Sequence, residues 1–122
     1  MTSVLNVDTI ADKAGTGPVA LTKQSAAKAW GHVATANSTT LDDSFNYTSV
    51  TDNGTGDWTY AFTNSMTNSA YSFVSIHGSA GSNSAFSRSN TYATGSIRFW
   101  TYTGAGVTDA VLITNTVNGD LA

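Results

Sequence analysis

The chain has 122 residues, with no Cys, one Pro, 11 Gly and a formal net charge of −3. A chain of this length typically forms one domain, and the lack of Cys excludes a disulfide framework and thiolate metal ligands. No apolar run reaches the ~18–20 residues of a membrane span, and the acidic balance offers no basic patch for a phosphate backbone. We therefore expect no nucleic-acid partner and no membrane insertion.

The residue types favour strands over helices. The chain is rich in Thr, Ser, Asn and Gly, which are poor helix formers. Thr together with Tyr, Phe, Trp and Val suits strands, whereas Gly, Asn, Asp and Ser suit the turns between them. The composition predicts an all-β fold, and the spacing of the expected strands described below narrows it to an antiparallel β-sandwich or a jelly-roll-like domain.

Residues 1–40 are expected to form an N-terminal segment of their own. Apolar runs at residues 4–10 and 19–21 flank a turn that contains Gly and Pro, which predicts a strand–turn–strand unit. Two such strands cannot bury a core. Their apolar faces must be covered either by the β domain or by copies of the same chain.

A short helix is expected over residues 23–30. Thr22 is a good N-cap, and Ala26, Ala29 and Trp30 follow the i, i+3, i+4 spacing of one helix face. A helix of about eight residues is unstable alone. We therefore expect its small, Ala-rich face to pack closely against a partner.

Residues 31–40 are expected to be a connector or a short edge strand, and residues 41–122 a β-sandwich domain. Short strands with turn residues between them, at roughly 10-residue spacing, are typical of this architecture. After the first hairpin, strands are expected at residues 70–77, 85–92, 96–103 and 109–117, with a loop at 78–83.

The first hairpin has the clearest pattern. Trp58, Tyr60 and Phe62 alternate strictly after the turn signal Asn53-Gly54. The spacing before the turn breaks period two once, which predicts a bulge near residues 48–49. Burial of a large aromatic side chain contributes roughly 1.5–3 kcal/mol. The expected aromatic core residues are Phe45, Tyr47, Trp58, Tyr60, Phe62, Tyr71 and Phe99.

Candidate catalytic and metal-binding residues are few. Asp52 and Asp57 flank a tight turn, where Asp commonly bonds to the backbone, and the stretch lacks the register of a calcium loop. His32 and His77 are the only candidate bases, and neither accompanies a nucleophile motif or a paired metal-ligand spacing. We expect no enzyme activity, no cofactor and no metal site.

A binding surface is a better candidate. If Ile97 and Phe99 face the core, the residues alternating with them point outward, as a platform for a sugar ring or a neighbouring subunit. The stretch 78–92 adds aromatic residues among Ser and Asn, a mixture typical of paratopes. The candidate receptor-binding residues are Phe86, Arg88, Tyr92, Arg98, Trp100 and Tyr102.

Five stretches carry a resemblance to a known class of proteins: LNVDTI at 5–10, GTGPV at 15–19, LTKQSAAKAW at 21–30, DSFN at 43–46 and TDNGTGD at 51–57. Over about residues 4–63, the chain resembles tail-fibre and related appendage proteins of tailed bacteriophages. The resemblance implies a virion component, usually a homotrimer, attached to other virion tail or adaptor proteins. Its distal β-rich domain would bind a host-surface glycan or outer-membrane protein. No catalytic residues are implied.

The implied homotrimer gives the lean N-terminal segment a partner, since copies meeting along an axis would cover its apolar faces. The interface residues expected on this basis are Leu5, Val7, Ile10, Ala26, Ala29 and Trp30. Two alternatives stay open. The chain could be a structural head or tail appendage that binds no receptor, or it could be a carbohydrate-binding module.

Overall fold

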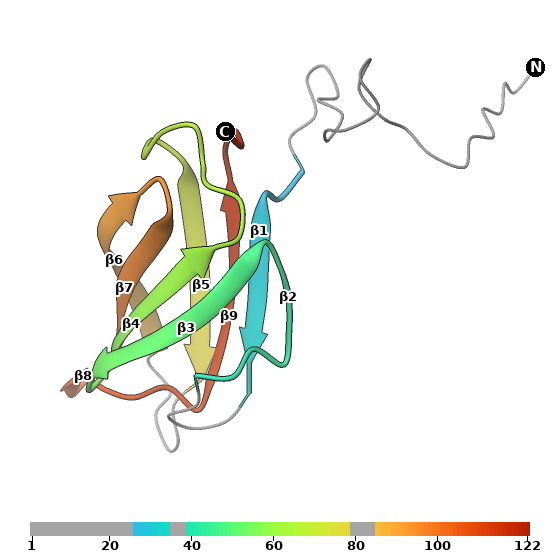
Figure 1. Ribbon diagram of the computed structural model, residues 1–122. Coiled ribbons are helices and arrows are strands. Elements are labelled where there is room, and N and C mark those ends of the chain that lie inside the picture. Colours follow the sequence, from blue (N-terminus) through green and yellow to red (C-terminus); the bar gives the residue numbers. More distant parts are fainter. Residues whose placement is uncertain (1–25, 35–38, 79–84) are drawn as a thin grey trace, which may run out of the picture.

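The chain forms two antiparallel β-sheets packed face to face (Figure 1). The computed structural model describes residues 26–34, 39–78 and 85–122. The first sheet has the strand order β2-β1-β9-β5, and the second has the order β3-β4-β7-β6 with β8 paired to β7. The strands are β1 (Ala29–Val33), β2 (Asp43–Phe45), β3 (Tyr47–Gly54), β4 (Asp57–Phe62), β5 (Ser72–Gly78), β6 (Ala85–Ala93), β7 (Ser96–Thr103), β8 (Gly106–Val107) and β9 (Leu112–Asn118). The predicted all-β, sandwich-like fold is confirmed for the described residues.

Strand β1 stands where a helix was predicted over residues 23–30. Ala29 and Val33 point into the core, whereas Trp30 points outward, so the side chains follow the period of a strand. Short apolar patterns fit either period, and here pairing with β2 and β9 decides the outcome. The helix prediction is wrong for its described part, and residues 23–25 lie outside the described residues.

Strand β1 is also an inner strand, not the connector or edge strand expected over residues 31–40. It bonds to β2 on one side and to β9 on the other. Gly31 lets β1 lie close to β3 of the second sheet, because a Cβ atom at this position would lie 3.0 Å from the ring of Tyr47. The sandwich therefore begins before residue 41.

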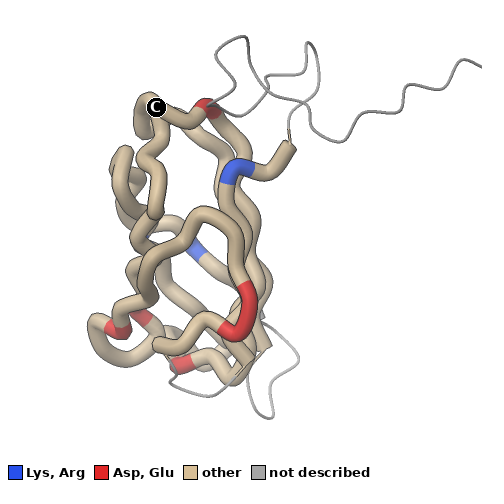
Figure 2. Tube along the Cα trace, turned by 45° about the vertical axis from the view of Figure 1, so that its right-hand side comes forward, with Lys and Arg blue, Asp and Glu red and all other residues tan. Residues whose placement is uncertain are grey.

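The predicted hairpin is formed by β3 and β4. The register of the pair shifts at the bulge predicted near residues 48–49. The turn lies just after the predicted residues 53–54, because Gly54 already pairs with Asp57. Within the turn, Gly56 has a φ of 62°, which Gly adopts without strain. Most acidic residues of the described chain lie toward the end of the sandwich that carries the β3–β4 turn, away from the C-terminus (Figure 2).

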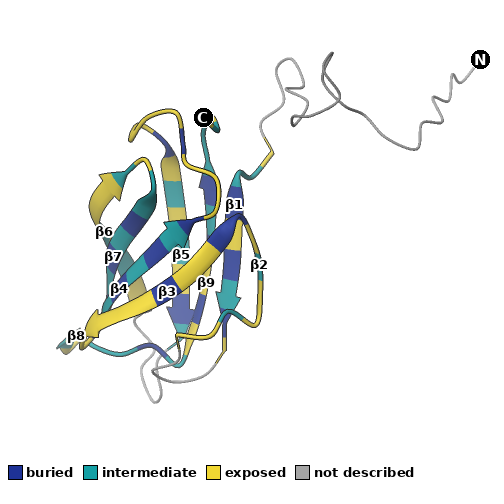
Figure 3. Cartoon of the chain, viewed as in Figure 1, coloured by how far each residue is buried: buried dark blue, intermediate teal, exposed yellow. Residues whose placement is uncertain are grey.

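The core lies between the two sheets and is built from alternate residues of their strands (Figure 3). Tyr60 and Phe99 are each 0% exposed, with ring centroids 5.4 Å apart. Aromatic residues of the predicted core that are buried here are Tyr47, Trp58, Tyr60, Phe62, Tyr71 and Phe99. The prediction is wrong for Phe45, which is 49% exposed.

Asn46 explains the exposure of Phe45. It is the one non-glycine residue with a positive φ among the described residues, at 60°. The chain passes here from β2 in the first sheet to β3 in the second. Phe45 and Tyr47 are two residues apart but lie in different sheets, so the alternation that would place both in the core does not hold across Asn46.

The later strands β5, β6, β7 and β9 lie where strands were predicted. In β9, Ile113 and Val117 are buried, whereas Val111 precedes the strand and is half-buried. In β5, the inward residue at the C-terminal end is His77, and Val74 and Ile76 point outward. Residues 79–83 of the predicted loop lie outside the described residues.

His77 forms a small polar cluster inside the sandwich. Its side chain is covered by the protein, and Nδ1 lies 3.3 Å from Ser87 Oγ, which also donates a hydrogen bond to Ser75 Oγ at 3.2 Å. Burial lowers the pKa of His77 below its usual value of 6.5. The folded protein therefore holds this imidazole neutral at pH values where the unfolded chain would bind a proton.

The cluster predicts a pH-dependent stability. Because the folded-state pKa is depressed, the full stability is present above pH 6.5 and declines as the pH falls toward the folded-state pKa. We expect the urea midpoint of unfolding to fall between about pH 7.5 and pH 5.5. His77→Asn should remove most of this fall, whereas the matched variant His32→Asn should keep it. An unchanged pH profile in His77→Asn would contradict the assignment.

Candidate functional site

Strand β7 presents polar and aromatic side chains on the outer face of the second sheet. Ile97 and Phe99 are completely buried, so the alternating residues Arg98, Trp100 and Tyr102 point away from the core. This confirms the alternation predicted from the sequence. Since β7 lies between β4 and β6 (Figure 1), side chains from both neighbours border this row.

Strand β6 contributes Phe86 and Arg88 to the same surface. Phe86 pairs with Tyr102 and Arg88 pairs with Trp100 across the strands. The Phe86 and Tyr102 rings are stacked, with centroids 5.3 Å apart and planes within 3°. The Trp100 and Tyr102 rings meet edge to face at 6.4 Å. These residues, with Arg98 and the Asp57 side chain described next, are called the aromatic face.

Arg98 is held by an ion pair at the margin of the aromatic face. Its Nε and Nη2 atoms donate hydrogen bonds to the two carboxylate oxygens of Asp57, at 2.9 Å and 2.6 Å. The Arg98 guanidinium lowers the pKa of Asp57 below its usual value, and Asp57 in turn raises the pKa of Arg98. A bidentate pair of this kind fixes the guanidinium plane and neutralises its charge.

Arg88 differs from Arg98 in its surroundings. Its side chain is exposed, and its guanidinium carbon lies 5.8 Å from the centroid of the Trp100 ring, within the range of a cation–π contact. Among the described residues, no carboxylate forms an ion pair with it. The aromatic face thus combines one neutralised arginine with one arginine whose charge is open to a ligand.

Tyr92 does not lie on the aromatic face, although the sequence analysis placed it among the same candidate receptor-binding residues. It pairs with the buried Ile97, and its ring centroid lies 5.1 Å from that of Tyr71 on the core side. The register shifts between Ser89 and Thr91, so one extra residue inverts the alternation along β6. The bulge places Tyr92 on the opposite side from Phe86 and Arg88.

The expected trimer-interface residues that the structure describes do not share one surface. Ala29 is 0% exposed inside its own chain, so it has no surface to offer another copy. Trp30 is 39% exposed on the outer face of the first sheet, and Ala26 is exposed before β1. The remaining expected residues, Leu5, Val7 and Ile10, lie outside the described residues, as do both strands expected before residue 22.

Asp57 is the one member of the site that the sequence analysis missed. It was interpreted as a turn residue, but it is the first residue of β4 and lies opposite Trp100 in β7. Its partner Arg98 is 41 positions away in the sequence. Only the strand register brings the two together, so no local pattern could have indicated the pair.

The side chains of the aromatic face are of the types that recognition surfaces use. Stacked rings provide apolar area with few rotatable bonds, and the arginines provide charge and hydrogen-bond donors. Among the described residues, no three His, Asp or Glu side chains gather as a metal site. His77 contacts Ser87, and His77 itself is only 3% exposed.

Comparison with known proteins gives no match: no family model fits the chain, and no curated protein or solved structure is significantly similar. No helix among the described residues is long and apolar enough to cross a membrane.

Proposed function

We propose that this chain is an attachment protein of a bacteriophage virion, which binds a host-surface receptor through the aromatic face without catalysis. The observation that carries the proposal is the paired arrangement of Phe86 with Tyr102 and of Arg88 with Trp100 on one outward sheet surface. Aromatic and arginine side chains dominate the energetics of recognition surfaces. The receptor would be a glycan or an outer-membrane protein.

The construction of the face supports recognition by rigid side chains. Phe86 is 53% exposed, although large apolar residues gain free energy by burial. Its ring is already oriented by stacking on Tyr102, and Arg98 is oriented by Asp57. Preorganised side chains lose little conformational entropy when a ligand binds, so more of the contact energy is available as affinity.

The sequence supports the placement in a virion. The resemblance to appendage proteins of tailed phages covers about residues 4–63, which include β1 to β4. A homotrimer attached through tail or adaptor proteins would present three copies of the aromatic face to one cell. Three weak sites acting together give an avidity far above that of one site.

The proposal predicts that removing Trp100 weakens attachment. Purified protein should block adsorption of the phage that carries it, and Trp100→Ala should raise the concentration needed for half-maximal blocking by at least about tenfold, a typical effect of losing an interface hot spot. Arg88→Gln should act in the same direction. Circular dichroism would confirm that both variants are folded.

Tyr92→Ala is the matched control, because Tyr92 is an aromatic residue of β6, the strand that carries Arg88, and lies on the opposite side of the sheet from Trp100. It should leave blocking within about twofold of the wild type. A saturating protein concentration that blocks no adsorption would favour the structural-appendage alternative. Binding to sugars on a glycan array without any effect on adsorption would favour a carbohydrate-binding module.

A further inference from the structure

Ser87 lies beneath the aromatic face. It stands between Phe86 and Arg88 in β6, and successive side chains of a strand point to opposite sides, so its hydroxyl points inward while both neighbours point outward. Across β7 it pairs with Thr101, which is completely buried. The contacts of the Ser87 hydroxyl therefore bear on the position of the two β6 residues that the aromatic face uses.

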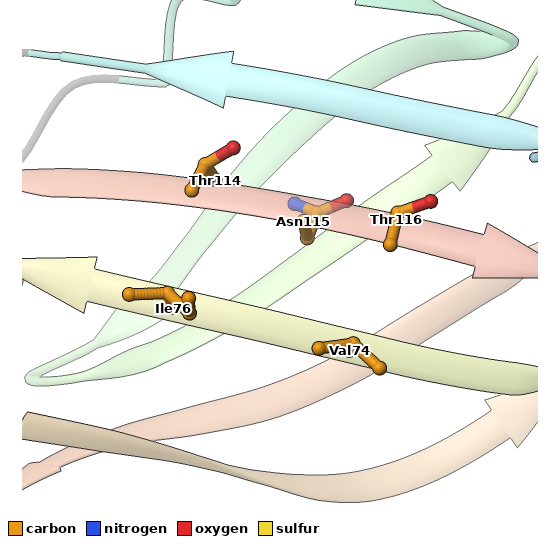
Figure 4. Close-up of a pocket in the computed structure, with 5 residues that line it drawn as sticks. All are labelled: Val74, Ile76, Thr114, Asn115 and Thr116. Atoms are coloured by element: carbon orange, nitrogen blue, oxygen red, sulfur yellow. The ribbon is translucent and has the colours of Figure 1, made fainter.

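Ser87 is held from the other sheet by side chains of β5. In that strand, Val74 and Ile76 point outward, whereas Ser75 and His77 point inward. The outward side borders a groove of about 150 Å³, lined by Val74, Ile76, Thr114, Asn115 and Thr116 (Figure 4). On the inward side, Nδ1 of His77 lies 3.3 Å from Ser87 Oγ, which donates a hydrogen bond to Ser75 Oγ at 3.2 Å.

These contacts join the edges of the two sheets. Strand β5 bonds only to β9 in the first sheet, and β6 bonds only to β7 in the second. The two edge strands lie against each other. Among the described residues, the polar contacts between them are those of the Ser87 hydroxyl. An edge with so few bonds across it opens at a lower free-energy cost than the core of the sandwich.

The surroundings of His77 are suited to a neutral ring alone. The Ser87 hydroxyl donates to Ser75, so it accepts from His77, and this assigns the ring proton to Nδ1. The other nitrogen, Nε2, is buried and has no hydrogen-bond partner of normal geometry among the described residues. A second proton would therefore bury an N–H group without an acceptor and a charge without a counterion, and both are costly.

No described carboxylate pairs with the His77 ring. Strands β5 and β9 and residues 79–84 contain no other ionisable residue, and those of β6 and β7 are Arg88, Tyr92, Arg98 and Tyr102. Asp109, just before β9, accepts a hydrogen bond from the backbone N–H of Gly56 at 2.6 Å. The buried phenols Tyr47 and Tyr60 stay neutral, because burial raises the pKa of each.

We propose that His77 is an acid-sensitive support of the aromatic face. At neutral pH the uncharged ring holds Ser87, and Ser87 fixes the inner side of β6 between Phe86 and Arg88. When the ring takes up a proton, water stabilises the charge, so the β5–β6 edge opens and these two residues lose their support. The aromatic face then binds its receptor at neutral pH and releases it in acid. The release rests on the proposed function, whereas the opening of the edge does not.

The direction of the effect follows from linkage. Burial lowers the pKa of His77 below 6.5, and the backbone of Tyr102 opposes this shift less strongly. Opening exposes the ring to water, which returns its pKa toward 6.5, so the open form binds the proton more tightly than the closed form. Acid therefore favours the open edge, and alkaline pH favours the closed one.

An NMR titration of the wild-type protein from about pH 7.5 to pH 4 tests the opening without a receptor. The ring signals of His77 should titrate with a midpoint below the usual pKa of 6.5, and the backbone signals of Phe86 and Arg88 should change with the same midpoint. His77→Asn should abolish this change, because an amide takes up no proton in this range. His32→Asn is the matched control and should keep the change, since the His32 side chain is 43% exposed on the first sheet.

Three results of this titration would overturn the inference. One is a His77 ring that stays neutral throughout the range, and another is a ring that titrates while the signals of β6 stay unchanged. The third is a loss of signal dispersion in all strands at the same pH, which is unfolding of the whole domain. The wild-type titration decides among these results even if His77→Asn does not fold.

A second test ties the edge together. The hydroxyl oxygens of Ser75 and Ser87 are 3.2 Å apart, so cysteines at both positions are placed to form a disulfide between β5 and β6. The chain has no other Cys to compete. In the oxidised Ser75→Cys/Ser87→Cys protein, the acid change at Phe86 and Arg88 should be absent, and reduction should restore it. An acid change that persists with the disulfide intact would contradict an opening of this edge.

Blocking of phage adsorption measures the consequence for binding. Once four-fifths of the molecules have an open edge, the concentration needed for half-maximal blocking should rise at least about fivefold, and the oxidised double-cysteine protein should resist this rise. Equal blocking on both sides of the His77 midpoint would overturn the acid-driven release. A protein that blocks no adsorption at neutral pH would instead remove the proposed function, while the opening that NMR measures would stand.

Discussion

Replacing Asn46 with alanine should lower the free energy of unfolding by about 3 kcal/mol, since it removes several partly buried hydrogen bonds and leaves a strained backbone. Its Nδ2 donates hydrogen bonds to the carbonyl oxygens of Lys28 and Asn64, each at 3.0 Å. Its Oδ1 accepts from the backbone N–H of Asn64 at 2.7 Å. Urea denaturation would measure the loss as a lower midpoint.

A glycine at the same position separates the two causes. Asn46 has a φ of 60°, which Asn tolerates better than Ala and which Gly adopts freely. Asn46→Gly should therefore be more stable than Asn46→Ala by about 1 kcal/mol. It should still be less stable than the wild type, because the hydrogen bonds are gone. Equal stability of the alanine variant and the wild type would show that this junction does not hold the two sheets together.

Replacing Phe99 with alanine should cost about 3–5 kcal/mol, the range for truncating a fully buried aromatic residue. Phe99 is 0% exposed at the centre of β7. Its ring centroid lies 5.4 Å from that of Tyr60 and 5.0 Å from that of Phe73. Small domains are stable by about 5–15 kcal/mol. We therefore expect a large fall in the urea midpoint and loss of the aromatic face that β7 supports.

Phe45→Ala is the control for this prediction, because the sequence placed both residues in the core. Phe45 is 49% exposed, so its truncation in a monomeric protein should cost below about 1 kcal/mol. A similar loss of monomer stability in Phe99→Ala and Phe45→Ala would contradict the assignment of the core.

The two sheets present different chemistry to solvent. The second sheet carries stacked rings with the arginines Arg88 and Arg98, and the first carries rings beside an uncharged groove. These surfaces lie on opposite outer faces of the sandwich (Figure 1).

Elements with a local pattern could be predicted from the residues alone. Trp58, Tyr60 and Phe62 alternate without interruption, and so do Ile97 and Phe99 with the residues between them. In a strand, neighbours two apart share a face whatever the rest of the chain does. The sheet class, the β3–β4 hairpin with its bulge, and the outward direction of Trp100 were predictable for this reason.

Features that depend on strand partners could be identified only from the folded structure. The spacing around Ala29 fits a helix as well as a strand, and only pairing on both sides of β1 selects the strand. Tyr92 leaves the aromatic face because a bulge in β6 inverts the alternation, and Asp57 enters it through a register with β7. Each outcome depends on hydrogen bonds between segments far apart in the chain, and a local pattern carries no information about those contacts.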